Sequence, residues 1–388
     1  MKIWLRMALI LNIIFLFPSR VTSDHSMHSF KIERHKVLSQ FGKVLPASYI
    51  LYPVLSGSGR IFRQPIFAVD GATLRLHFKI DKPAQNTAWR VAIMDATGRR
   101  VWDYTETSGE QDFWSDEIPT PSATVEIYSD EPNSKLNLRI DRLAVYAEPS
   151  EPDAIHGRND LVEVVRVGGN IEYDWARAVA RLRFISDDDD KQYYCTGFLI
   201  SPDLFITNNH CIRNKSEMRS ALVDFDYKFK GRLPNTYRFK EFIITDPDLD
   251  FSILRMDRVF PESERKALKL YASDIVVERA DLIIIQHPGG KVQHLSKVGC
   301  LVQDALTNGL TASLTDFGHQ CDTLGGSSGS PVLNPLNGQV YGLHHLGFDP
   351  EDTQRNRIRL INRAVHMKKI IELIRERRPD LIQELPRS

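Results

Sequence analysis

The sequence predicts an all-β protein that carries one helix close to its C-terminal end. Short runs of alternating apolar and polar residues recur along most of the chain, as in Thr73–Ile80, and this period of two is typical of half-buried strands. Turn dipeptides such as Thr97-Gly98 separate the runs. A helical period appears only near the end, where one apolar face before Pro379 contains Val365, Ile370, Ile371 and Ile374.

Length and composition set the broad class of the protein. The 388 residues suffice for two or three domains, and 42% hydrophobic with 26% charged residues is typical of globular proteins. Lys plus Arg and Asp plus Glu number 50 each, so the formal net charge is zero. No global field favours nucleic acid or an anionic membrane, and we expect neither as a partner.

Residues 1–23 have the features of a secretory signal peptide. Lys2 and Arg6 precede the apolar run Met7–Phe17, and Val21-Thr22-Ser23 offers small residues for cleavage. The run is too short to cross a bilayer comfortably, although an uncleaved anchor is the alternative. The mature protein is therefore expected to be secreted, into either the extracellular space or the periplasm, and to have no membrane attachment.

Export makes the four cysteines informative. Cysteines in an even number in an oxidising compartment predict two disulfides, and three pairings of Cys195, Cys211, Cys300 and Cys321 are possible. No Cys-x-x-Cys is present, so we expect no zinc, and we expect no other metal or cofactor. The four carboxylates at Asp187–Asp190 admit a calcium site, but such a charge run is more typical of a solvated hairpin tip.

The chain divides into two β regions. Residues 24–148 predict a small antiparallel β-sandwich, with a polar lead-in to about Ala47 and strands between Phe62 and Tyr146. The acidic, proline-containing Glu148–Asp153 predicts an exposed linker, and residues 149–172 a linker and lead-in to the second region at 173–388.

The second region opens with loosely alternating residues and continues as a series of short strands. His287 follows one of them within His-Pro-Gly-Gly, where it could be a ligand but more often caps a turn. The expected strands are Ala176–Ile185, Tyr194–Ser201, Leu204–Thr207, Phe242–Thr245, Phe251–Met256, Leu282–Ile285, Val298–Val302 and Val340–His345.

The segment Gly326-Ser327-Ser328-Gly329-Ser330-Pro331 concentrates backbone freedom in front of an apolar run. Such a segment can project a serine oxygen while nearby N–H groups point at one spot, as acyl transfer requires. Ser328 is the candidate nucleophile. A flexible Gly/Ser turn is the alternative reading of this segment taken alone.

Three stretches carry a resemblance to a known family. The run from Cys195 to His210-Cys211 resembles the surroundings of the catalytic histidine in chymotrypsin-fold serine proteases. Asp250 precedes an apolar strand as the family's triad aspartate does, with Asp246 and Asp248 nearby as further carboxylates. The loop around Ser328, ending Gly-Ser-Pro, is similar to the V8-like glutamyl-endopeptidase branch, as is Gly157-Arg158-Asn159-Asp160. The resemblance covers about 153–379, in the order His, Asp, Ser.

The resemblance implies a chymotrypsin-like double β-barrel followed by the C-terminal helix. It implies a Cys195–Cys211 disulfide, after which Cys300–Cys321 follows by elimination. It implies that His210, Asp250 and Ser328 are catalytic and that the N–H groups of Gly326 and Ser328 form the oxyanion hole.

The substrate pocket is less sharply defined by the resemblance. Thr323 and His344 match residues that contact the substrate carboxylate in glutamate-specific relatives, which slightly favours an acidic P1 residue. His345 takes that place if the alignment slips by one. Asp322 stands where trypsin-like enzymes carry a carboxylate that favours Lys or Arg, unless it belongs to a structural loop beside Cys321.

The sandwich, including Phe113-Trp114-Ser115, resembles the N-terminal regions of bacterial secreted trypsin-like and lysyl-endopeptidase-like precursors. The resemblance is compatible with the propeptide of a zymogen and with an accessory module, and we expect the sandwich to bind either the protease domain or a ligand of its own. Ser327 stands where trypsins have an aspartate for the freed N-terminus, so trypsin-style activation is not expected.

The sequence as a whole predicts a secreted serine endopeptidase that acts on protein or peptide substrates through an acyl-enzyme. The alternative is a binding or adhesion protein that keeps the protease fold without turnover. A hydrolase of the α/β type is disfavoured because the Gly-x-Ser-x-Gly elbow is absent.

Overall fold

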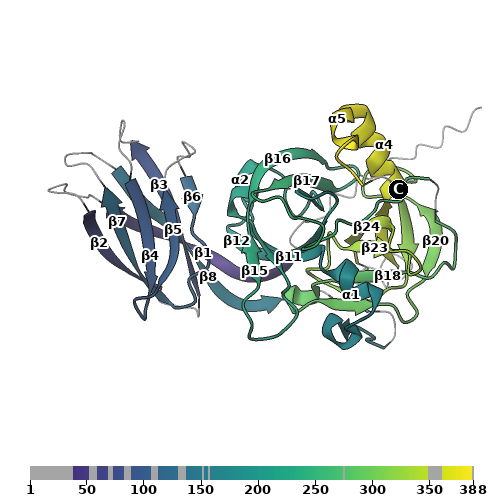
Figure 1. Cartoon of the computed structure of the whole chain (residues 1–388), viewed down its shortest axis with the longest axis horizontal. Coiled ribbons are helices and arrows are strands. Elements are labelled where there is room, and N and C mark those ends of the chain that lie inside the picture. Colours follow the sequence, from purple (N-terminus) through teal and green to yellow (C-terminus); the bar gives the residue numbers. More distant parts are fainter. Residues whose placement is uncertain are drawn as a thin grey trace, which may run out of the picture.

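The computed structural model consists of a small β unit and a larger unit of curled sheets, joined by two long strands (Figure 1). The predicted all-β architecture with a C-terminal helix is confirmed. The expected signal peptide lies outside the described residues, as does Gly157 of the short signature. The structure describes residues 38–51, 59–68, 73–82, 89–105, 112–129, 137–150, 153–155, 158–273, 276–347 and 361–386.

The N-terminal unit is built from two facing antiparallel sheets. One sheet has the order β2-β7-β4-β5, and the other face is formed by β1, β8, β3 and β6. Alternate side chains of both sheets meet in one apolar core, which includes Leu76, Phe78 and Val125. The bounds are β1 Ser39–Leu51, β2 Gly59–Phe67, β3 Leu74–Lys82, β4 Trp89–Asp95, β5 Arg100–Thr105, β6 Asp112–Trp114, β7 Ser122–Ser129 and β8 Asn137–Ser150.

Strands β1 and β8 continue out of the sandwich and join the second unit. β1 pairs with β8 along its length and, through its first residues, with β12, so Ser39 lies opposite Tyr194. The expectation of a polar lead-in up to Ala47 is therefore wrong from Ser39 onward, because backbone pairing on both sides overrides the polar side chains. Likewise, the first part of the expected linker at Glu148–Asp153 belongs to β8, which ends at Ser150.

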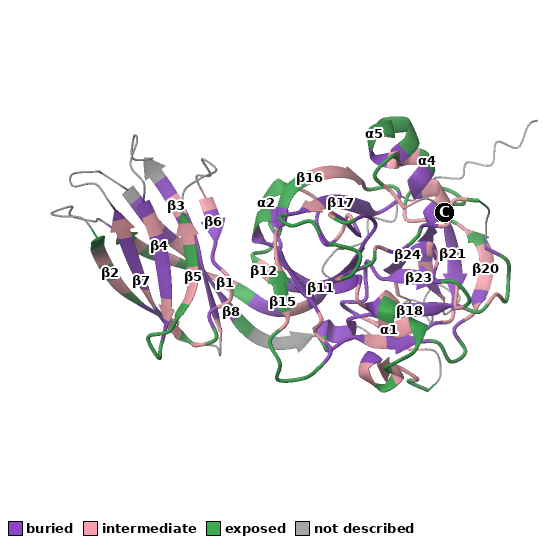
Figure 2. Cartoon of the chain, in the orientation of Figure 1, coloured by how far each residue is buried: buried purple, intermediate pink, exposed green. Residues whose placement is uncertain are grey.

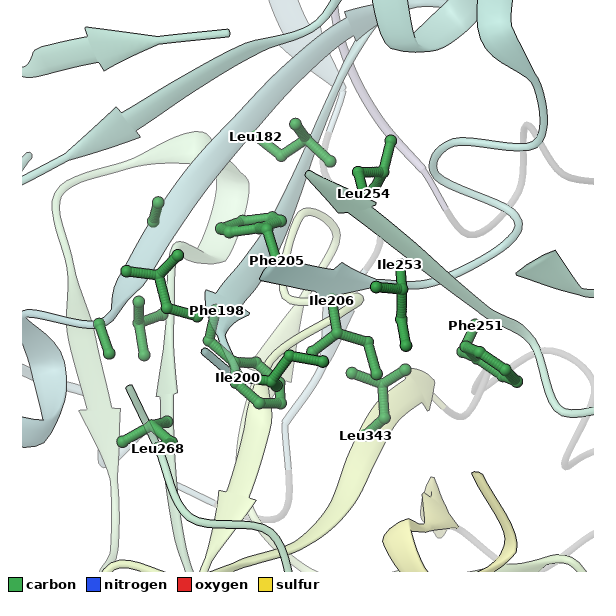
Figure 3. Close-up of a cluster of buried hydrophobic side chains, with 14 of the residues drawn as sticks. Leu182, Phe198, Ile200, Phe205, Ile206, Phe251, Ile253, Leu254, Leu268 and Leu343 are labelled. Carbon is green, nitrogen blue, oxygen red and sulfur yellow. The ribbon is translucent and has the colours of Figure 1, made fainter. Parts of the chain in front are cut away.

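The first barrel of the larger unit packs on an apolar cluster that extends into the second barrel, for example to Leu343, and Figure 3 shows part of it. Phe198, Phe205 and Leu254 are buried there, and every residue of β11 is buried as well. The expected strands Leu204–Thr207 and Phe251–Met256 are present with the same bounds. The elements are β9 Asp153–Ala154, β10 Val162–Glu163, η2 Val164–Val167, α1 Ile171–Ala176, β11 Val179–Ile185, β12 Lys191–Leu199, β13 Leu204–Thr207, α2 Lys215–Ser220, β14 Leu222–Phe225, β15 Asn235–Tyr237, β16 Phe239–Asp246 and β17 Phe251–Met256.

The second barrel is an eight-stranded sheet with the order β10-β19-β18-β23-β24-β25-β21-β20. Two expectations are corrected here: Val298 lies in an exposed turn, with the strand starting only at Val302, and Val365 belongs to a strand before the helix. The elements are β18 Ile283–Gln286, η3 Pro288–Gly290, β19 His294–Ser296, β20 Val302–Thr307, β21 Asp316–His319, β22 Thr323–Leu324, β23 Pro331–Leu333, β24 Val340–Leu346, β25 Asn362–His366, α4 Met367–Arg377 and α5 Pro379–Ile382.

Helix α4 packs against β24 and β25 of the second barrel. Met367, Ile370, Ile371 and Ile374 form the buried face of α4, while its basic residues lie mainly outside (Figure 2). None of the helices formed by the described residues combines the length and apolar composition of a membrane span.

A network of arginines fastens the sandwich to the first barrel. Arg75, which is buried, donates to the carbonyl oxygen of Ser115 within the sandwich at 3.0 Å and to that of Ser220 in the barrel at 2.8 Å. From the barrel side, Arg183 forms an ion pair with Glu117 and Arg238 with Asp116. The sandwich and the barrel thus share both a sheet and a polar interface.

Candidate active site

His210 lies in the loop that follows β13, next to a disulfide. Both expected bridges are present, Cys195–Cys211 and Cys300–Cys321. The sulfurs of Cys195 and Cys211 lie within 4.8 Å of a ring nitrogen of His210. Because these sulfurs are bonded to each other, this trio does not act as a metal site. The disulfide instead joins β12 to the end of the loop that carries the histidine.

Asp250 holds both the backbone and the ring of His210. Its Oδ1 accepts the His210 N–H at 2.9 Å, and its Oδ2 lies 2.7 Å from His210 Nδ1. Asp250 has a φ of 43°, a left-handed conformation that is uncommon outside glycine and concentrated at functional sites. Asn208 supports this conformation by donating its side-chain amide to the Asp250 carbonyl oxygen at 2.9 Å.

The two neighbouring carboxylates point to other partners. Asp246 accepts the N–H groups of Asp248 and Leu249 and forms an ion pair with Arg377 at 2.8 Å. Asp248 accepts a hydrogen bond from the Thr311 hydroxyl. Of the three aspartates that the sequence offered for orienting His210, only Asp250 makes that contact in the described structure.

The environment of Asp250 keeps it ionised although it is buried. Burial by itself works to raise the pKa of this carboxyl. The charges and hydrogen bonds of His210 and His345 outweigh burial and hold the pKa of Asp250 well below its ordinary value. An ionised carboxylate can only accept hydrogen bonds, so the neutral His210 ring carries its proton on Nδ1 and leaves Nε2 as the basic nitrogen.

The loop that carries Ser328 is tied to β12 on both sides of the serine. Thr196 donates its N–H to the Ser328 carbonyl and its hydroxyl to the Gly326 carbonyl, both at 2.8 Å. Gly329 has a φ of +88°, and a Cβ atom there would lie 2.0 Å from the Thr196 carbonyl oxygen, so only glycine fits. Strand β12 also carries Cys195, whose disulfide lies beside His210. One strand therefore connects the Ser328 loop with the histidine.

Two backbone N–H groups of this loop differ from their neighbours. Ser327, Gly329 and Ser330 donate their N–H groups to carbonyl oxygens, at 2.8 to 3.1 Å. Those of Gly326 and Ser328 make no such bond within the described part of the chain. Donors without a partner beside a serine are what an oxyanion would need.

The four residues considered for the substrate pocket have different surroundings in the structure. The Asp322 carboxylate accepts the Asp160 N–H at 2.9 Å, so it is bonded to the lead-in segment before the barrels. His344 Nδ1 lies 3.2 Å from Nε2 of His319, and burial lowers the pKa of His344 to about 3. The buried Thr323 hydroxyl has no partner within the described residues.

The fourth residue, His345, contacts Asp250. Its Nδ1 lies 3.2 Å from Asp250 Oδ2 and its Nε2 lies 2.8 Å from Asp316 Oδ2. Sequence reasoning missed Asp316 and His319. Both lie in the short Asp316–His319 run before Cys321, a sequence that offers no motif by which to find them.

Two further expected features have structural partners. His287 Nδ1 lies 3.0 Å from the Lys291 carbonyl oxygen, as a turn-capping histidine does, and burial lowers the pKa of His287 to about 3. The acidic run Asp187–Asp190 forms the exposed turn between β11 and β12. Its four carboxylates contact Ser216, Arg213, Tyr193 and Arg142 respectively.

Comparison with known proteins agrees with this geometry. Residues 195–343 match the family model described as trypsin-like peptidase domain. This segment of the chain is therefore similar to trypsin-like peptidase domains. The matched segment includes His210, Asp250 and Ser328.

Three relatives show how far the similarity extends. "Secreted RxLR effector protein 73" of Plasmopara viticola is 25% identical over 303 residues, 70% of this chain and 73% of the relative. "Uncharacterized protein y4fB" of Sinorhizobium fredii is 32% identical over 216 residues, 50% of this chain and only 31% of that protein. "Trypsin" of Phaedon cochleariae is 24% identical over 216 residues, 48% and 80% of the two chains.

Solved protease structures also align with the chain. The active form of the Rv3671c protease from M. tuberculosis aligns over 58% of this chain and 87% of its own, with 17% identity and a TM-score of 0.42. Deg5 aligns over 54% and 93% of the two chains, with 16% identity and a TM-score of 0.40.

Proposed function

We propose that this protein is a secreted serine endopeptidase whose triad is His210, Asp250 and Ser328. The observation that carries the proposal is the pair of hydrogen bonds from His210 to the buried, ionised Asp250. This pair fixes the ring and its tautomer inside a trypsin-like peptidase domain, with the Ser328 loop anchored to the neighbouring strand.

In the proposed reaction, Ser328 Oγ attacks the substrate carbonyl carbon while His210 Nε2 accepts the hydroxyl proton. The imidazolium that results is stabilised by Asp250 and then gives the proton to the leaving amine, which breaks the peptide bond. Water hydrolyses the acyl-enzyme by the same steps, with His210 again as the base. No redox partner or metal is needed for this sequence of steps.

Stabilisation of the tetrahedral intermediate is assigned to the N–H groups of Gly326 and Ser328. Their lack of backbone acceptors within the described chain leaves both available to a developing oxyanion. Loss of one such donor typically costs a factor of about 10² to 10³ in turnover.

Secretion and the V8-like branch are part of the proposal. Two disulfides are compatible with an oxidising compartment, and the relative from Plasmopara viticola is named as a secreted effector. The Gly-Ser-Pro ending of the Ser328 loop supports the V8-like assignment.

For the substrate we propose an acidic P1 residue. The Asp322 carboxylate is bonded to the Asp160 N–H, which removes the main argument for a basic P1 residue. Thr323 offers a buried hydroxyl without a partner in the described chain, a group that could donate to a substrate carboxylate. With peptides that differ only at P1, kcat/KM should be highest for Glu and should fall most for Glu in Thr323→Val. A preference for Lys would contradict this assignment.

The deciding experiment for the activity itself compares the wild type with Ser328→Ala on a mixture of unstructured peptides. We expect hydrolysis by the wild type and none above background by the variant, with equal melting temperatures. Ser330→Ala is the matched control, since it alters a serine of the same loop. Hydrolysis by Ser328→Ala at the wild-type rate would reject the proposed nucleophile. A folded wild type that cleaves nothing would favour the binding or adhesion alternative.

A further inference from the structure

Asp250 receives hydrogen bonds from two histidines, of which the proposed reaction uses only one. The oxygen that accepts from His210 Nδ1 at 2.7 Å also lies 3.2 Å from His345 Nδ1. The other nitrogen of His345 lies 2.8 Å from Asp316 Oδ2. The four side chains therefore form one continuous chain of contacts: His210, Asp250, His345 and Asp316.

This chain of contacts is inaccessible to solvent except at its first residue. The His210 side chain is 11% exposed, whereas those of His345 and Asp316 are 1% and 0% exposed. The second oxygen of Asp316 accepts the Thr315 hydroxyl at 2.9 Å. Buried carboxylates in such positions require partners of their own, and His345 supplies one to each of two carboxylates.

The backbone directs His345 toward the two aspartates. In the pairing of β24 with β25, His344 lies opposite Ala364 and Leu346 opposite Arg363, so His345 is the extra residue of a β-bulge. Bulges re-aim one side chain and are frequent beside active sites. In a regular strand, His345 would lie opposite a residue of β25. The bulge is therefore consistent with a His345 side chain that contacts Asp250.

The contacts also define the protonation of His345. Each ring nitrogen faces a carboxylate oxygen, which can only accept, so both nitrogens carry protons when both carboxylates are ionised. Burial works to lower the pKa of His345, but Asp316 and Asp250 outweigh it and raise that pKa to about 9. His344 is a further titratable neighbour of His345. Burial, and after it the charge of His345, lowers the pKa of His344.

We propose that His345 is a positioning residue of the peptidase: anchored by Asp316 at Nε2, it donates from Nδ1 to the Asp250 oxygen that orients His210. The inference rests on the proposed function and adds a residue to it. With His345 charged, two carboxylates face one cation at rest. When His210 accepts the serine proton, the buried group becomes neutral overall, which favours the transition state over the ground state.

Two substitutions separate the two nitrogens of His345. In His345→Asn the amide nitrogen replaces Nδ1 and can still donate to Asp250, whereas in His345→Gln it replaces Nε2 and reaches Asp316 instead. We expect kcat to fall by about tenfold or less in His345→Asn and by about 100-fold or more in His345→Gln, with KM unchanged in both. His345→Asn leaves the Asp316 carboxylate without its histidine partner. Adding Asp316→Asn removes that carboxylate, so the double variant should melt at a higher temperature than His345→Asn and have the same kcat. Equal losses of kcat in the two single variants would overturn the positioning role.

A second measurement needs neither activity nor a variant of His345. In the full-length Ser328→Ala protein labelled with ¹⁵N-histidine, NMR at pH 8 should find one ring with both nitrogens protonated among the 12 histidines. Absence of any doubly protonated ring at that pH would overturn the inference. Labelling of the wild type by a fluorophosphonate reports on the proposed peptidase function separately, so the two ideas fail by different results.

Discussion

Two buried charge networks, one at the active site and one at the junction with the sandwich, use similar carboxylates with different cations. At the junction, Asp224 is fully buried between Arg181 and Arg183, with N···O distances of 2.7 to 3.0 Å. Burial works to raise the pKa of Asp224, but the two guanidinium groups hold it well below its ordinary value. At the active site, Asp250 is held by two histidines instead.

The choice of cation separates a structural contact from a network that transfers protons in the proposed reaction. Arginine stays charged at any physiological pH, so the junction keeps one charge state, and Arg183 also reaches Glu117 of the sandwich. Histidine changes charge near neutral pH, so the Asp250 network can accept and return a proton. We therefore expect substitutions at the active site to change rates more than stability, and substitutions at the junction to do the reverse.

The largest effect is expected for Asp250→Asn. The variant would favour the wrong tautomer of His210, and kcat/KM should fall by about 10⁴-fold while the melting temperature changes little. Asp248→Asn is the matched control, because that carboxylate contacts Thr311 and not the histidine. The comparison would fail if Asp248→Asn were the more damaging of the two in steady-state kinetics.

The next effect concerns stability. Asp224→Asn would leave Arg181 and Arg183 buried without their carboxylate, and we expect a loss of about 3 to 5 kcal/mol in the free energy of unfolding. The folded fraction should keep kcat/KM within about twofold of the wild type, because we expect substitutions at the junction to change stability more than rates. In Asp188→Asn, which removes a partly exposed ion pair with Arg213, the change in the free energy of urea unfolding should stay below about 1 kcal/mol. Expressed as free energies, a loss of kcat/KM in Asp224→Asn larger than the loss of unfolding free energy would contradict the distinction between the networks.

The two disulfides offer a comparison of intermediate size. Each closes a short loop, with sequence separations of 16 and 21, so replacing either pair by alanine should cost about 3 kcal/mol. Only the Cys195–Cys211 pair borders His210, so its removal should also lower kcat at a temperature where both variants are folded. Equal kcat in the two double variants would indicate that the bridge does not position the histidine.

The smallest expected effect is a dependence of stability on pH. A histidine whose pKa is raised on folding contributes stability that is fully present below its unfolded value, about 6.5, and is lost as pH rises through the folded value. His345 has a folded pKa of about 9, so the melting temperature of Ser328→Ala should fall by a few degrees between pH 6.5 and 9. The fall should be smaller with Asp316→Asn added. A melting temperature that rises over this window would contradict the charge assigned to His345.

Local sequence patterns predicted the strands whose own residues indicate that they are buried. Leu204–Thr207 and Phe251–Met256 are mostly apolar, and both are strands with those bounds. β1 was missed because its residues are mixed in polarity, and its pairing with β8 and β12 brings together strands distant in sequence. Such partners cannot be inferred from a window of a few residues.

The candidate site divides in the same way. His210, Asp250 and Ser328 each stand in a short motif, so the sequence was enough to name them as candidates. Asp316 and the role of His345 depend on the register of β21, β25 and β24 and on one bulged residue. A single-residue bulge leaves no mark in the sequence, so the pocket assignment could not distinguish His344 from His345.

The central claim is that Ser328 is an activated nucleophile, and labelling with a fluorophosphonate followed by peptide mapping tests it most directly. We predict one label per folded molecule, located on Ser328, at a rate that falls sharply in Asp250→Asn and is retained in Asp248→Asn. A folded protein that takes up no label, or that carries the label on a different serine, would contradict the account.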